Sequence, residues 1–190
     1  MNVYDFDNTI LRGDSTARFF AFCLFRMPRM WPDAAGQIGN AALFLLQRRG
    51  KQAFKERMFR FLAVVPDLDK AIERFWDRNF RRVKPFYLAQ HRDDDVVISA
   101  SPEFLIRPAC ERLGIRAVIG SPVDKSTGRF LGTNCHGAEK VRRFFEQFPD
   151  GTIDDFYSDS HSDRPLADVA RRAFFVRGDK ISPWNGRGSV

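Results

Sequence analysis

The sequence has few cysteines, and they form no pattern. Of the 190 residues only Cys23, Cys110 and Cys135 are cysteines, and they are far apart, odd in number and without a C-x-x-C pair. This indicates neither a disulfide framework nor a zinc site. We therefore expect a protein of the reducing cytoplasm.

Long apolar runs are also missing. The longest stretch without a charged residue, residues 34–47, is too short to cross a bilayer as a helix. The first residues contain no basic region followed by an apolar stretch, so we expect no signal peptide. With 44% hydrophobic and 29% charged residues, the composition excludes wholesale disorder and fibrous architectures.

Positive charge and phenylalanine are abundant, and both are concentrated in one segment. Residues 14–92 hold 16 Lys and Arg against seven Asp and Glu, a net charge of +9, and 11 of the 20 Phe. The remainder carries a net charge of −2. The chain therefore reads as a basic, Phe-rich insertion, 14–92, in a slightly acidic core formed by 1–13 and 93–190.

Hydrophobic periodicity predicts different structures for the two parts. The insertion reads as helices: one from an N-cap at Ser15 to residue 25, then 41–49, 51–62, and one opened by residues 66–67. In the core, strands at 2–6, 96–98, 117–119, 153–157 and 173–177 alternate with helices at 102–113, 136–148 and 163–172; a hairpin spans 121–134, and a loose tail begins at 178. This alternation predicts an α/β fold with a parallel sheet and right-handed crossovers.

Polar residues follow the expected strands, where a parallel sheet binds its ligands. They are Asp5, Asp7, Ser99, Ser101, Asp159 and Asp163, with Lys140 early in a helix. Clustered carboxylates repel unless a cation neutralises them, and oxygen ligands suit Mg²⁺. A cation, a lysine and a hydroxyl together suit a phosphoryl group, which a neighbouring carboxylate can attack to form an aspartyl-phosphate.

Four motifs resemble those of the haloacid dehalogenase-like superfamily. Asp5-Phe6-Asp7-Asn8-Thr9 looks like its D-x-D-x-T motif, residues 98–101 like the strand ending in Ser or Thr, Lys140 like the third motif, and residues 158–163 like the acidic fourth motif. The helical insertion between the first two motifs, with the stretches 99–105 and 134–141, is similar to the phosphoserine-phosphatase-like branch, subfamily IB. The resemblance implies a Rossmann-like core with an inserted all-helical cap.

The resemblance also implies a role for each residue. Asp5 would be the nucleophile, and Asp7 would protonate the leaving alcohol and then deprotonate water. The implied Mg²⁺ ligands are the carboxylates of Asp5 and Asp159 and the backbone carbonyl of Asp7, with Asp163 supporting. The implied phosphate-binding residues are Ser99, Lys140 and Asn8. Phosphoserine phosphatases typically carry Glu where Asp14 stands and Asn where Ser162 stands, so both positions bear on substrate specificity and count against phosphoserine itself.

Some single residues have plainer interpretations. Ser99 could cap a helix, and Ser101, directly before Pro102, reads as a helix N-cap. Taken alone, Lys140 could be a solvent-facing helix residue. His91, His136 and His161 lack a paired metal spacing, and we expect surface or structural roles for them.

The sequence leaves the substrate open. The expected function is a Mg²⁺-dependent phosphomonoesterase acting on a small phosphorylated metabolite. Residues 19–25 and 41–46 are apolar nearly all round, and basic residues follow the second run, which suits peripheral contact with the inner face of an anionic membrane. The branch that the chain resembles includes a phosphatidylglycerophosphate phosphatase, so the resemblance implies a lipid phosphatase of that kind as the alternative. A silent phosphate-binding module is a further alternative. Nucleic acid binding is not expected, because no binding motif appears, and the oligomeric state is left open.

Overall fold

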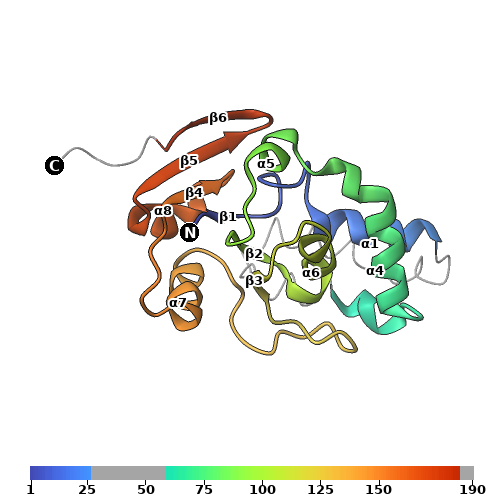
Figure 1. Cartoon of the computed structure of the whole chain (residues 1–190). Coiled ribbons are helices and arrows are strands. Elements are labelled where there is room, and N and C mark those ends of the chain that lie inside the picture. Colours follow the sequence, from blue (N-terminus) through green and yellow to red (C-terminus); the bar gives the residue numbers. More distant parts are fainter. Residues whose placement is uncertain (27–58, 185–190) are drawn as a thin grey trace, which may run out of the picture.

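The computed structural model describes residues 1–26 and 59–184, and a six-stranded sheet forms the centre of this part of the chain (Figure 1). The strands lie in the order β3-β2-β1-β4-β5-β6. Their bounds are β1 Val3–Tyr4, β2 Val96–Pro102, β3 Ala117–Ser121, β4 Asp155–Ser158, β5 Arg172–Arg177 and β6 Lys180–Pro183. The pairings among β1 to β5 are parallel. The predicted α/β fold with a parallel sheet is therefore confirmed.

The sixth strand is a difference from the sequence prediction, which expected a loose tail from residue 178. β6 pairs antiparallel with β5, with Val176 opposite Ile181. Gly178 and Asp179 form the two-residue connection, and Gly178 adopts a φ of 62°, which suits the tight turns that join such strands. With a single large aliphatic side chain in the strand, β6 has too little hydrophobic alternation to be read as a strand.

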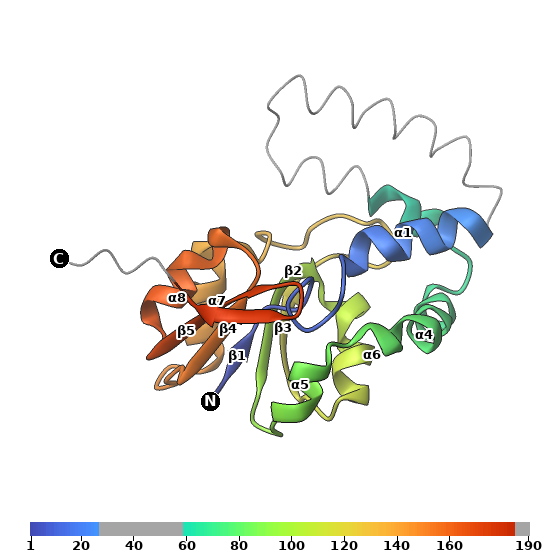
Figure 2. The ribbon, with the colours of Figure 1, turned by 90° about the horizontal axis from the view of Figure 1, so that it is seen from above.

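Helices cover both faces of the sheet (Figure 2). Their bounds are α1 Ser15–Arg26, α4 Leu68–Asn79, α5 Pro85–Gln90, α6 Glu103–Arg112, α7 Ala138–Gln147 and α8 Arg164–Val169. Successive strand residues alternate between the faces: Val96 and Ile98 belong to the cluster that includes Phe144 of α7, whereas Val97 belongs to the cluster that includes Ile106 of α6. β2 is thus buried on both sides, as expected for a parallel sheet.

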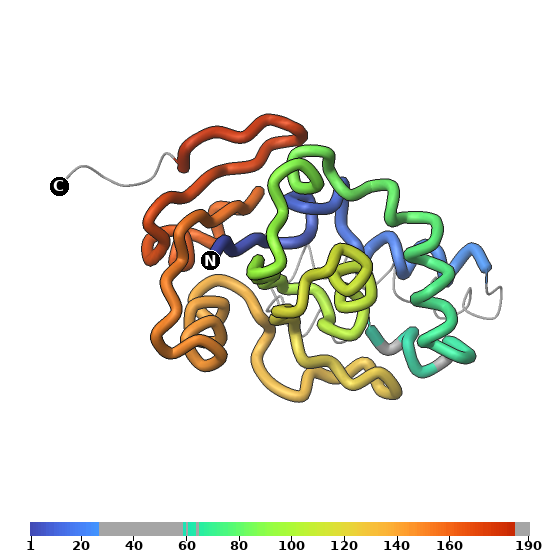
Figure 3. Tube along the Cα trace, in the orientation of Figure 1, coloured from blue at the N-terminus to red at the C-terminus, as the bar shows by residue number. Residues whose placement is uncertain are grey.

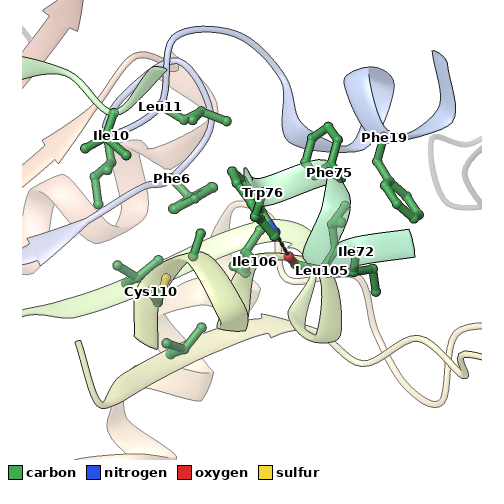
Figure 4. Packing of buried hydrophobic residues seen from close by; sticks show 14 of the residues in the cluster. Phe6, Ile10, Leu11, Phe19, Ile72, Phe75, Trp76, Leu105, Ile106 and Cys110 are labelled. Atoms are coloured by element: carbon green, nitrogen blue, oxygen red, sulfur yellow. Dashed lines mark hydrogen bonds between the residues drawn. The ribbon is translucent and has the colours of Figure 1, made fainter. Parts of the chain in front are cut away.

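The helices of the insertion pack against the core through aromatic side chains (Figure 4). Phe75 and Trp76 of α4 are fully buried, and Trp76 contacts Phe6 of the loop after β1 with ring centroids 5.9 Å apart. The indole Nε1–H of Trp76 donates to the carbonyl of Leu105 in α6 at 2.7 Å. These contacts hold α4 beside the start of α6, next to the carboxyl edge of the sheet.

The start of α1 differs from the sequence prediction by one residue. Ser15 was the expected N-cap, but it is the first residue of the helix, and the carboxylate of Asp14 accepts the backbone N–H of Ala17 at 2.8 Å. Asp is as good an N-cap as Ser, so local preference could not choose between the two neighbours. Farther along α1, Phe19 and Cys23 are buried.

The division into a cap, 14–92, and a core, 1–13 with 93–190, stays a prediction. Within the predicted cap, α5 packs on the sheet through Tyr87, whose ring lies 4.9 Å from that of Tyr4. The helix expected at 41–49 and most of the one at 51–62 lie outside the described residues, as does the apolar run 41–46 on which the membrane alternative largely depends. In the described part, no helix combines the length and apolar character needed to span a membrane. Figure 3 traces the backbone through the connections between the helices and strands.

Candidate active site

The loop after β1 carries two of the predicted site residues at the carboxyl edge of the sheet. Asp5 is 7% exposed, and its backbone N–H donates to the carbonyl of Tyr157 in β4 at 2.9 Å. Asn8 adopts a left-handed conformation with φ 57°, and its N–H donates to the carbonyl of Gly13 at 3.2 Å. Asn is one of the few residues that adopt this conformation readily. An Asn at this position therefore favours the tight turn between β1 and α1.

Lys140 joins two of the carboxylates. Its Nζ donates to Asp5 Oδ1 and to Asp163 Oδ2, each at 2.7 Å, and the side chain is 1% exposed. Ser158 Oγ donates to the same Oδ2 of Asp163 at 2.7 Å. Burial by itself lowers the pKa of Lys140, but the carboxylates of Asp5 and Asp163 raise it above its ordinary value. Lys140 is therefore a buried ammonium group with two anionic partners, and it is not a solvent-facing helix residue.

Burial also governs the carboxyl group of Asp5. It raises the pKa of Asp5 to about 7, against the lowering effect of Lys140, and the nearby charge of Asp163 adds to the rise. One ammonium group therefore does not fully offset the effect of burial and of the neighbouring Asp163 on this carboxylate. Its Oδ2 atom receives only a long hydrogen bond, from Thr9 Oγ1 at 3.4 Å, among the described residues.

Asp7 has neutral partners instead. Its Oδ1 accepts the backbone N–H of Ser15 at 2.6 Å, and its Oδ2 accepts the hydroxyl of Ser101. Ser101 Oγ also lies 2.9 Å from Thr16 Oγ1. The pKa of Asp7 is raised to about 6. Burial is the main cause and the negative charge of Asp14 contributes, whereas the hydrogen bond from Ser101 acts in the opposite direction. Asp7 is therefore poised to exchange a proton near neutral pH.

The position of Ser101 corrects the N-cap interpretation. β2 continues to Pro102, which occupies the N-cap position of α6, and no side chain caps that helix. The backbone N–H of Ser101 donates to Ser99 Oγ at 3.1 Å. Both serines are buried, so Ser101 supports Asp7, and Ser99 lies beside it at the same strand end.

Asp159 follows β4, and Thr9 links it to the loop of Asp5. The backbone N–H of Asp159 donates to Thr9 Oγ1 at 3.0 Å, and the same hydroxyl reaches the carboxylate of Asp5. Burial raises the pKa of Asp159, and the charge of Asp163 raises it further. Among the residues described, no other residue donates a hydrogen bond to the Asp159 carboxylate.

This donor set fits Mg²⁺, although residues 1–26 and 59–184 contain no group of three or more His, Cys, Asp or Glu side chains that could hold a metal ion. Mg²⁺ typically uses one or two carboxylates and fills its other positions with water and substrate oxygen atoms. Asp5 and Asp159 supply two carboxylates whose pKa values burial raises, and they follow the adjacent strands β1 and β4. Asp163 is already bound to Lys140 and Ser158, so its contribution to a metal site, like that of Asp7, stays a prediction.

The remaining predicted site residues lie at the rim. Asn8 and Asp14 are exposed, and Asp14 is engaged as the cap of α1. Ser162 Oγ lies 2.8 Å from Ser160 Oγ. His161 stacks on Phe175 with ring centroids 4.6 Å apart, in keeping with the structural role expected of it. Contacts with phosphate at Asn8 and with substrate at Asp14 and Ser162 stay predictions.

Sequence reasoning assigned no role in the site to Thr9, Thr16 or Lys84, and it read Ser101 as a cap. Two signals were present: Thr9 is the Thr of the D-x-D-x-T motif, and Ser101 stands two residues after Ser99, a spacing that favours one side of a strand. Thr16 and Lys84 carried no signal, because each meets the site only through the folding of distant segments.

Comparison with known proteins agrees with the site. The model of the family described as haloacid dehalogenase-like hydrolase matches residues 3–168. Protein CicA from Caulobacter vibrioides is 28% identical over 183 residues, covering 88% of this chain and 81% of that protein. A histidinol-phosphatase from Neisseria meningitidis is 30% identical over 99 residues, covering 46% of this chain and 45% of that protein.

Solved structures share the fold. A protein of unknown function from Bordetella pertussis Tohama I superposes with a TM-score of 0.74 at 20% identity, covering 91% of this chain and 87% of the other. A phosphoserine phosphohydrolase-like protein from Francisella tularensis gives 0.57 at 14% identity, covering 91% and 86%. The predicted family, whose members are hydrolases, and the predicted fold are confirmed. The chain belongs to the haloacid dehalogenase-like hydrolase family.

Proposed function

We propose that this hydrolase is a Mg²⁺-dependent phosphomonoesterase that forms an aspartyl-phosphate on Asp5. The observation that carries the proposal is the arrangement around Asp5, where a buried ammonium group holds one carboxylate oxygen and the other has, within residues 1–26 and 59–184, only a weak partner. An attacking carboxylate needs both features, because it must be oriented and must keep a free lone pair.

In the proposed first step, Asp5 attacks phosphorus and the P–O bond to the leaving group breaks. Lys140 fixes the carboxylate and compensates negative charge as the phosphoryl group approaches. Mg²⁺ held by Asp5, Asp159 and the Asp7 carbonyl would reduce the repulsion between carboxylate and phosphate. Asp7 donates its proton to the departing oxygen, as its raised pKa allows.

In the second step, the ionised Asp7 takes a proton from water, and the resulting hydroxide attacks the phosphorus of the aspartyl-phosphate. The Asp5 carboxylate leaves, and inorganic phosphate is the product. The same side chain thus serves first as acid and then as base, which requires a pKa near the working pH. The hydroxyl of Ser101 keeps Asp7 oriented in both steps.

For the substrate we propose a small phosphorylated metabolite. Phosphatase relatives whose names specify small substrates, such as the histidinol-phosphatase, support this choice. Phosphoserine itself is disfavoured by Asp14 and Ser162, since the first is engaged as a helix cap and the second bonds to a neighbouring serine.

Release of inorganic phosphate from a panel of phosphorylated metabolites tests the proposal, with and without Mg²⁺. Expected is hydrolysis of at least one monoester that stops when EDTA is added and is absent in Asp5→Asn. A panel that includes short-chain phosphatidylglycerophosphate separates the two substrate classes. Hydrolysis that is indifferent to Mg²⁺, or retained in Asp5→Asn, would contradict the mechanism.

A further inference from the structure

Lys84 is a buried cation that the proposed mechanism does not use. It is 2% exposed, although it belongs to the segment that returns from the predicted cap to the core. Its Nζ donates to two backbone carbonyls, those of Asn8 and of Gly178, the second at 2.6 Å. Burial lowers the pKa of Lys84. No described carboxylate lies within ion-pair distance of Lys84. Among the described residues, the partners of its buried ammonium group are therefore these two carbonyl groups.

The backbone around Lys84 is fixed to the same loop. Its N–H donates to the carbonyl of Ile10 at 2.8 Å, and the N–H of Arg12 donates to the carbonyl of Arg82 at 2.9 Å. Leu11 and Val83 form an antiparallel bridge between these two bonds. The ammonium group is therefore held at a defined place relative to the loop after β1.

The carbonyl that Lys84 binds belongs to Asn8, whose φ of 57° lies in the left-handed region. Besides Gly, only Asn and Asp visit this region routinely, and then as single residues. The N–H side of Asn8 is held by Gly13 and its carbonyl side by Lys84. Both peptide planes that meet at Asn8 are thereby fixed, and the first contains the carbonyl of Asp7.

We infer that Lys84 is a positioning residue for the Mg²⁺ site: by clamping Asn8 in the left-handed conformation, it aims the Asp7 carbonyl at the cation. This inference rests on the site proposed above. It extends that site to a residue 76 positions away from Asn8 in the sequence, in a segment that bears none of the motifs.

If Lys84 acted only through its charge, neutralising it would change Mg²⁺ affinity in the opposite direction from that expected of a positioning residue. The side chain is close enough to Asp159 for the two charges to interact, so a cation at this place repels Mg²⁺, and removing its charge alone would tighten binding. Loss of the clamp would weaken binding, because the Asp7 carbonyl would no longer be held. Outer partners of metal ligands typically affect affinity by roughly 10–100-fold.

The experiment measures Mg²⁺ affinity by calorimetry on the full chain, with Lys84→Met compared with wild type and with Lys125→Met as control. Lys125 is half exposed and pairs with Asp69 on the surface. Expected is Mg²⁺ binding weakened by about 10–100-fold in Lys84→Met, with lowered kcat, and wild-type affinity in Lys125→Met. Equal or tighter binding by folded Lys84→Met would overturn the inference.

Two further comparisons cover a variant that fails to fold and separate this inference from the proposed function. If Lys84→Met does not fold, Lys84→Gln replaces it, since its neutral amide can still donate to one carbonyl; weakened binding is again expected, and unchanged binding again overturns the inference. A wild-type chain that binds Mg²⁺ but hydrolyses no ester refutes the proposed function and leaves the Lys84 comparison valid. A wild-type chain that binds no Mg²⁺ refutes both.

Discussion

Asp5 and Asp7 lie two residues apart in one loop, but their partners differ. Asp5 is bound by an ammonium group, whereas Asp7 is bound by a backbone amide and a hydroxyl and lies near the negative charge of Asp14. Surroundings of this kind divide two like carboxyl groups between two tasks. Lys140 favours the ionised form of Asp5 against the effect of burial, and Mg²⁺ bound at Asp5 would favour that form further, as a nucleophile requires. The pKa of Asp7, about 6, suits a group that gives and takes a proton.

Replacing Asp5 by Asn is expected to lower turnover to below about a thousandth of the wild-type value. The amide is a poor nucleophile and a weaker ligand for Mg²⁺. Steady-state hydrolysis of a chromogenic phosphate ester measures the effect. Retention of most of the activity in Asp5→Asn, in protein that unfolds cooperatively like the wild type, would mean that another group attacks phosphorus.

Replacing Asp7 by Asn is expected to slow turnover by about 10²–10⁴-fold, with a marked dependence on the leaving group. A nitrophenolate leaves without a proton, whereas an alkoxide needs one. Formation of the phosphorylated enzyme should therefore survive better with nitrophenyl phosphate than with an alkyl phosphate. Rapid-quench measurement of both esters tests this, and an equal loss for the two would argue against Asp7 as the acid.

The individual site residues that sequence could predict are those carried by motifs, above all Asp5, Lys140 and Asp159. The structure brings Asp5 and Lys140 into contact and links the loop of Asp5 to Asp159 through Thr9. Lys84 could not be predicted, because an isolated lysine before a proline carries no local signal. Its burial results from two carbonyl groups that come from different parts of the chain.

Among the elements, the start of α7 determines where Lys140 lies. Gly137, at the N-cap position, has φ 62° and ψ −129°, a conformation that only glycine adopts without strain. The helix begins at the next residue, and Lys140 follows within its first turn. The direction in which the ammonium group enters the site therefore depends on one glycine.

Gly137→Ala is expected to destabilise the fold by about 1–3 kcal/mol and also to reduce kcat, since relief of the strain would rotate the first turn of α7. Space is not the obstacle, because an added Cβ would meet only the Ser162 carbonyl at 3.6 Å. Gly114→Ala is the matched control: Gly114 also has a positive φ, 77°, and an open surrounding. Denaturant unfolding and kinetics should show destabilisation in both variants but a kinetic loss in Gly137→Ala alone.

The elements that sequence predicts well are those with strong periodicity. The helix that was expected to open at residues 66–67 is α4, whose buried residues include Ile72, Phe75 and Trp76. β6 was missed because it is short and exposed, and its pairing depends on the edge that β5 leaves open. The start of α6 was predicted to within one residue, but β2 was predicted to end at residue 98, because its last residues, after an irregularity between Ile98 and Pro102, resemble a helix cap.

For the whole molecule, the raised carboxyl pKa values predict how stability changes with pH in the absence of Mg²⁺. The pKa of an unfolded Asp is about 3.9, and that of folded Asp7 is about 6. Between these values the folded chain holds the proton more tightly, so ionisation of Asp7 lowers the free energy of unfolding as the pH rises from about 4 to about 6.

Asp7→Asn removes this contribution. In EDTA, the free energy of unfolding of Asp7→Asn relative to wild type should therefore increase by about 1–3 kcal/mol between pH 4 and pH 7. Urea unfolding at several pH values measures the difference, and titrating groups that do not interact with Asp7 cancel in the comparison. A difference that stays constant or decreases with pH would show that Asp7 does not hold its proton in the fold.

Trapping of the covalent intermediate tests the central claim most directly. Asp7→Asn protein is mixed with nitrophenyl phosphate and Mg²⁺, quenched in acid and digested, and the peptides are analysed by mass spectrometry. The predicted result is one phosphoryl group on Asp5, absent without Mg²⁺ and absent in the Asp5→Asn, Asp7→Asn double variant. A phosphoryl group on any other residue, or hydrolysis by wild type with no phosphorylated enzyme in either protein, would contradict nucleophilic attack by Asp5.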